Sequence, residues 1–74
     1  MDYEYRELVR EIRDALVETV DDAEKLVASG IEGNERKIAY ALGEINALRM
    51  VFPAGISPAV NKRIHALMKL QARR

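Results

Sequence analysis

A chain of 74 residues with a net charge of zero makes one domain at most, and with one histidine and no cysteine it can form neither a disulfide nor a thiolate metal site. Acidic and basic residues are unevenly distributed along the chain. Residues 1–44 hold all twelve acids and six bases, whereas residues 45–74 hold six bases and no acid. These segments carry net charges of −6 and +6. Because so short a chain buries little surface and this one has no disulfide or thiolate metal site to stabilise it, we expect it to oligomerise.

The first expected element is an amphipathic helix over residues 3–28. We expect Tyr5 in its core and Tyr3 free for a partner, and Gly30 is placed to end the helix in a left-handed conformation. Apolar or small side chains recur at spacings of three and four, the pattern of one buried stripe: Tyr5, Leu8, Val9, Ile12, Ala15, Leu16, Thr19, Val20, Ala23, Leu26 and Val27.

The second expected helix covers residues 35–52, with Asn34 as its N-terminal cap. Its main apolar stripe is Ile38, Ala41, Leu42, Ile45, Leu48 and Phe52. A helix that is apolar nearly all round is buried on more than one side. The opposite side therefore needs cover from the third helix or from a second subunit. We expect it to be an oligomer interface, with Gly43 at a close helix crossing, formed by Ala39, Tyr40, Gly43, Ala47, Met50 and Val51.

The third expected helix covers residues 58–72. Ser57 followed by Pro58 is a strong start signal, because the hydroxyl caps the helix and proline suits its first position. No strand alternation or internal repeat is visible. The sequence predicts an all-α fold of one domain over residues 1–74: a helical hairpin plus a third C-terminal helix, completed by dimerisation into a helical bundle.

Acidic side chains gather on one side of the first helix, opposite its apolar stripe. Like charges at spacing four, such as Glu7 and Glu11, each cost about 0.2–0.5 kcal/mol, so a helix selected for stability alone would avoid them. We expect this acidic ridge to bind a partner, a second protein with a basic surface, although a merely solvated face explains the same pattern. The acidic ridge consists of Glu4, Glu7, Glu11, Asp14, Glu18, Asp21 and Asp22.

The third helix is basic, and clustered cations of this kind suit phosphate binding. The alternative is pairing with the acidic first helix, within the chain or between subunits. The segments Gly55-Ile56-Ser57 and Ala59-Val60-Asn61-Lys62-Arg63-Ile64-His65-Ala66 resemble the turn and recognition helix of Cro-type helix-turn-helix repressors. That resemblance implies nucleic-acid contacts from this helix, and the candidate residues are Asn61, Lys62, Arg63, His65, Lys69 and Arg73.

No arrangement of a nucleophile with His65, and no glycine-rich phosphate loop, is visible, so we expect no enzymatic activity, no cofactor and no metal. The start of the chain lacks the pattern of a signal peptide, and no apolar run is long enough for a membrane span. We therefore expect a cytoplasmic protein that acts by protein–protein interaction. Its size and charge pattern are typical of phage or mobile-element accessory proteins that inhibit a host factor. The alternative is a small DNA- or RNA-binding regulator.

Overall fold

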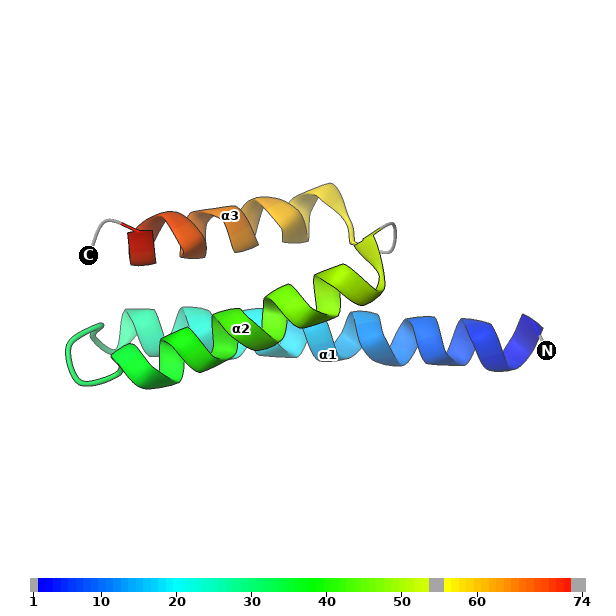
Figure 1. The fold of residues 1–74 in the computed structure, drawn as a ribbon, viewed down its shortest axis with the longest axis horizontal. Coiled ribbons are helices and arrows are strands. Elements are labelled where there is room, and N and C mark those ends of the chain that lie inside the picture. The colour runs from blue at the N-terminus through cyan, green and yellow to red at the C-terminus, as the bar shows by residue number, and fades with distance from the viewer. Residues whose placement is uncertain (1, 54–55, 73–74) are drawn as a thin grey trace.

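The computed structural model describes residues 2–53 and 56–72. They form three helices, α1 (Asp2–Ala28), α2 (Glu35–Val51) and α3 (Pro58–Ala72), and the described part contains no strand. Successive helices run in opposite directions along the long axis of the molecule (Figure 1). The molecule measures 46 × 18 × 16 Å. The all-α prediction of a helical hairpin packed with a third helix is confirmed, and the helix bounds lie within one residue of the expected ranges.

Residues 29–34 join α1 to α2 and depend on two glycines with positive φ, Gly30 at 119° and Gly33 at 91°, a region that glycine enters without strain. Asn34 occupies the N-cap position of α2, as expected, and its carbonyl oxygen accepts from the Ile38 backbone N–H at 2.9 Å, but its side chain makes no capping hydrogen bond. Its amide nitrogen instead donates to the oxygens of Gly30 and Ser29, at 2.8 and 3.2 Å. These bonds close the connection on itself, and a longer one from the same nitrogen to the Leu26 carbonyl oxygen, at 3.5 Å, ties it to α1.

The core lies where all three helices meet. Ile45, Ile64 and Val20 are fully buried, and no polar side chain in the described residues is buried with them. At the start of α3, the Ser57 hydroxyl accepts a hydrogen bond from the backbone N–H of Val60 at 3.2 Å, as expected for a capping serine. The full set of buried residues is Leu16, Val20, Ala23, Ile38, Ala41, Leu42, Ile45, Ile64 and Leu67.

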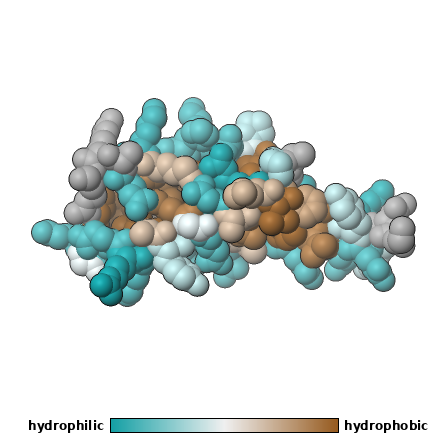
Figure 2. Space-filling view, in the orientation of Figure 1, coloured by the Kyte–Doolittle hydropathy of each residue, from teal (hydrophilic) through white to brown (hydrophobic). Residues whose placement is uncertain are grey.

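The first part of α1 extends beyond the end of α2, because α1 has 27 residues and α2 has 17. The apolar stripe of α1 is therefore covered only in part. Tyr5 was expected in the core, but this residue is 59% exposed. Its ring contacts the ring of Phe52 in a tilted arrangement, with ring centroids 6.0 Å apart. Figure 2 shows hydrophobic surface gathered near this end of the bundle, where α2 turns into α3.

Candidate interaction surfaces

The acidic ridge lies on the outer side of α1, away from the core. Its carboxylates are exposed except for Glu7 and Asp21, which are half-buried. Apart from Asp21, the ridge carboxylates make no hydrogen bond or ion pair within the described part of the chain. The intrachain neutralisation by the basic helix that we considered from the sequence is therefore limited to one member of the ridge.

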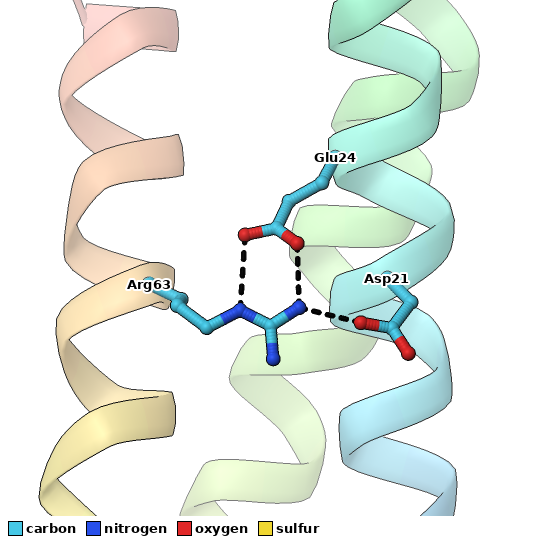
Figure 3. Close-up of polar contacts among 3 residues, drawn as sticks. All are labelled: Asp21, Glu24 and Arg63. Carbon is cyan, nitrogen blue, oxygen red and sulfur yellow. Dashed lines mark hydrogen bonds and ion pairs between the residues drawn. The ribbon is translucent and has the colours of Figure 1, made fainter.

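Asp21 belongs to a clamp that holds α3 against α1 (Figure 3). The Arg63 guanidinium donates from Nε to Glu24 Oε2 at 3.0 Å, and from Nη2 to Glu24 Oε1 and Asp21 Oδ1 at 2.5 Å each. This two-pronged contact is the geometry that arginine and carboxylate form best. The hydrogen bonds to Glu24, and then those to Asp21, raise the pKa of Arg63 above its ordinary value. Arg63 was a candidate nucleic-acid contact, but in this structure its side chain is engaged with α1.

The remaining basic side chains of α3 face away from α1. Lys62, His65 and Lys69 are exposed, have no partner among the described residues, and share one side of the helix through spacings of three and four. Asn61 is half-buried, and Arg73 lies outside the described residues. Helix α3 runs back alongside the hairpin (Figure 1), whereas the helices of a helix-turn-helix unit cross steeply.

The six residues expected to form an oligomer interface are all exposed on α2: Ala39, Tyr40, Gly43, Ala47, Met50 and Val51. No close helix crossing is formed at Gly43 within the chain, since a Cβ placed there meets no atom within 4 Å. The outer side of α2 is therefore an uncovered apolar surface. Met50 at 83% and Tyr40 at 78% are its most exposed large side chains.

An open groove lies between α1 and α2. Its hollow of about 410 Å³ is lined by Ala15, Glu18, Thr19, Asp22, Tyr40, Ala41 and Glu44. Ala15, Thr19 and Ala41 are the small side chains of the lining, and the Thr19 hydroxyl donates its proton to the Ala15 carbonyl oxygen at 2.8 Å, so toward a ligand it can only accept. Three carboxylates, from Glu18, Asp22 and Glu44, and the Tyr40 ring form the rest of its lining.

This groove joins two features that the sequence analysis treated as separate, the acidic ridge and the outer side of α2. Glu44 was not among the candidate residues, because α2 holds only one other acid, Glu35, nine residues before it, and shows no acidic ridge of its own. Only the pairing of α1 with α2 places it in the groove with Glu18 and Asp22. Helical wheels of α1 and α2 placed side by side as an antiparallel pair could have shown that Glu44 lies near these two residues.

A second surface that the sequence analysis missed is a basic stripe on the first half of α1. Arg6, Arg10 and Arg13 are exposed, have no ion pair with a described residue, and line a shallow hollow with Tyr5 and Val9. Their spacings of four and three place them on one side of the helix. These arginines offset the acids of the first half of α1, whereas residues 14–24 contain five acids and no base. The negative charge of α1 is therefore concentrated beside the groove.

Two kinds of site are absent from the described residues. No group of three or more His, Cys, Asp or Glu side chains is arranged to hold a metal ion. None of the described helices is long and apolar enough to cross a membrane. A hollow of about 380 Å³ at the other end of the bundle has a mainly apolar lining: Val27, Ile31, Glu35, Ile38, Leu67, Leu70 and Gln71.

Comparison with models of known protein families, with curated proteins and with solved structures gave no match to this chain. Function must therefore be inferred from the chemistry of its own surfaces.

Proposed function

We propose that this protein is a non-catalytic interaction module that binds another protein through its acidic ridge. The observation that carries the proposal is that the ridge carboxylates other than Asp21 have no partner among the described residues, although the chain contains as many bases as acids. The free lysines of α3 point outward, so the fold leaves the ridge available to a basic surface. Complementary charge of this kind speeds association and selects partners.

We also propose that the protein forms a homodimer through the outer side of α2. Ala39, Gly43 and Ala47 recur at spacing four and are exposed, so a second copy of α2 can approach closely there. Met50 supplies an apolar flank that is 83% exposed. The charge pattern and small size favour a regulatory role, such as that of a phage or mobile-element accessory protein that inhibits a host factor.

The alternative function is DNA or RNA binding by α3, favoured by the shared outward side of Lys62, His65 and Lys69. Retention on heparin separates the two functions. The proposal expects weak retention on heparin that Lys62→Ala with Lys69→Ala does not alter. Strong retention that is lost as salt rises and is abolished by those substitutions would support nucleic-acid binding instead.

The test of protein binding compares the parent with a variant in which the ridge carboxylates outside the Arg63 clamp, Glu4, Glu7, Glu11, Asp14, Glu18 and Asp22, are each replaced by lysine. Each is immobilised and exposed to an extract of the native host, and retained proteins are quantified. The proposal expects proteins that bind the parent in low salt and are absent from the variant. Equal retention by both baits would contradict a binding role for the ridge.

A further inference from the structure

We propose that the groove between α1 and α2 receives one basic amphipathic helix of a partner protein. This inference rests on the proposed function and specifies the binding surface and the partner. Helix α3 already covers one side of the α1–α2 hairpin. A partner helix in the groove would cover the other side and complete a four-helix bundle, an arrangement in which helices pack with small offsets from antiparallel.

The lining of the groove suits long cationic side chains. Lysine and arginine bury their carbon stems on apolar surface while their charged heads remain at the rim. The floor, Ala15 and Ala41, leaves room for such stems, and the exposed ring of Tyr40 offers a face for them. The heads would then reach the carboxylates of Glu18, Asp22 and Glu44.

The groove also has a direction. Leu8 lies seven residues before Ala15, and Val51 lies seven residues after Glu44. Seven residues are about two helical turns, so each lies on the groove side of its helix, two turns farther from the groove carboxylates. Leu8 is 50% exposed and Val51 is 60% exposed, and both are therefore open to a partner. The surface runs from an apolar end to an acidic end over about four helical turns. The matching helix is apolar at one end and basic at the other.

The charges of the groove disfavour a second copy of this chain as its occupant. A twofold symmetric contact would place Glu18, Asp22 and Glu44 against the same residues of the partner subunit, and like charges oppose such a contact. A contact between the groove and the basic side of α3 in another copy would be head-to-tail and would give a ring or a filament instead of a twofold dimer. The proposed dimer contact on Ala39, Gly43 and Ala47 lies beside the groove, and Tyr40 borders both surfaces.

The test uses two labelled peptides of the same lysine, leucine and alanine composition. In the patterned peptide, leucines form one helical stripe with lysines concentrated toward one end, and in the control peptide the order is shuffled. Fluorescence anisotropy measures the affinity of each for the full chain. The expected result is that the patterned peptide binds at least about tenfold more tightly, because electrostatic attraction to the ridge alone does not distinguish the two.

Two variants with equal changes of net charge locate the binding surface. Glu18→Lys with Asp22→Lys and Glu44→Lys reverses the groove, whereas Glu4→Lys with Glu7→Lys and Asp14→Lys reverses the ridge outside it. The groove variant should lose at least about tenfold in affinity for the patterned peptide, and the control should lose much less. If the groove variant fails to fold, Ala15→Trp serves instead, because it fills the floor without a change of charge.

Each other outcome overturns the inference. Equal binding of both peptides, or equal losses in both variants, would leave a ridge that binds by charge alone and would reject the groove. Failure of both peptides to bind the parent would reject the groove and the acidic binding surface together. A self-association that the groove variant alone alters would assign the groove to a second copy of the chain.

Discussion

The two sides of the α1–α2 hairpin differ in what covers them. On one side, α3 buries Ile64 and Leu67 and is held by Arg63. On the other side, the groove with its carboxylates is open. Asp21 and Asp22 show the difference most simply: they are neighbours in the sequence, but about 100° of helical rotation separates them. Asp21 binds Arg63, whereas Asp22 lines the groove, so the acids of one helix divide between assembly and binding.

The largest expected effect comes from the covered side. Ile64→Ala removes most of a fully buried side chain from the contact of α3 with the hairpin and should cost about 2–5 kcal/mol of unfolding free energy. That is a large share of the stability of so small a domain. Tyr40→Ala on the open side should change stability by less than about 0.5 kcal/mol. Urea unfolding of both variants compares the sides directly, and equal losses would show that the open side is part of the core.

Gly43 tests the outer side of α2. Because a Cβ there meets no atom within 4 Å, Gly43→Ala should stabilise each subunit by up to about 1 kcal/mol through helix propensity. Gly43→Leu should preserve the fold but dissociate the proposed dimer, since its bulk prevents a close approach of two α2 helices. Light scattering and thermal melts at several concentrations give both results. A Gly43→Leu protein that keeps the mass of a parent dimer would exclude close packing at this position.

The Arg63 clamp should contribute less than the core beside it, because its three side chains are all partly exposed. Arg63→Ala should lower the melting temperature less than Ile64→Ala and speed amide hydrogen exchange in α3. Arg63→Lys should rescue part of the loss, because lysine keeps the charge but not the two-pronged contact. Faster exchange throughout the chain, with none specific to α3, would argue against a local clamp.

The clamp also has a defined pH dependence. The folded-state pKa of Arg63 is raised by Glu24 and Asp21, so its contribution is fully present below the ordinary arginine pKa and is lost only in strong alkali. The stability difference between parent and Arg63→Ala should therefore stay constant between neutral and mildly alkaline pH. A difference that falls over that interval would mean that another titrating group controls the docking of α3.

Much of the fold could be predicted from the sequence, because its signals are local. The spacing of apolar residues marks the helices, Gly30 marks the end of α1, and Ser57 with Pro58 marks the start of α3. What could not be predicted depends on the relative placement of the helices. The expected helix lengths already implied that α1 extends past α2, but the continuous apolar stripe does not show which of its residues remain uncovered, so Tyr5 was placed in the core. The sequence also does not distinguish Glu24, which binds Arg63, from the acids of the ridge, or connect Glu44 with them.

The smallest expected effect lies on the ridge. Glu11→Lys with Glu18→Lys relieves repulsion with Glu7 and Asp22 and leaves the Arg63 clamp intact, because neither residue belongs to it. Stability should be unchanged or higher by a few tenths of a kcal/mol for each relieved pair, while partner binding is lost. Thermal melts at low and high salt measure this. A large loss of stability at low salt would reassign the ridge to assembly.

The central claim is that the fold keeps one side of the hairpin open for a basic helix, and chemical-shift mapping tests it most directly. In a titration of the ¹⁵N-labelled chain with the patterned peptide, the account predicts the largest amide shifts at the groove residues, including Ala15, Thr19 and Tyr40. The amides of α3 around Lys62 and Lys69 should remain nearly unchanged. Shifts concentrated on α3, or spread evenly along the ridge without the groove, would contradict the account.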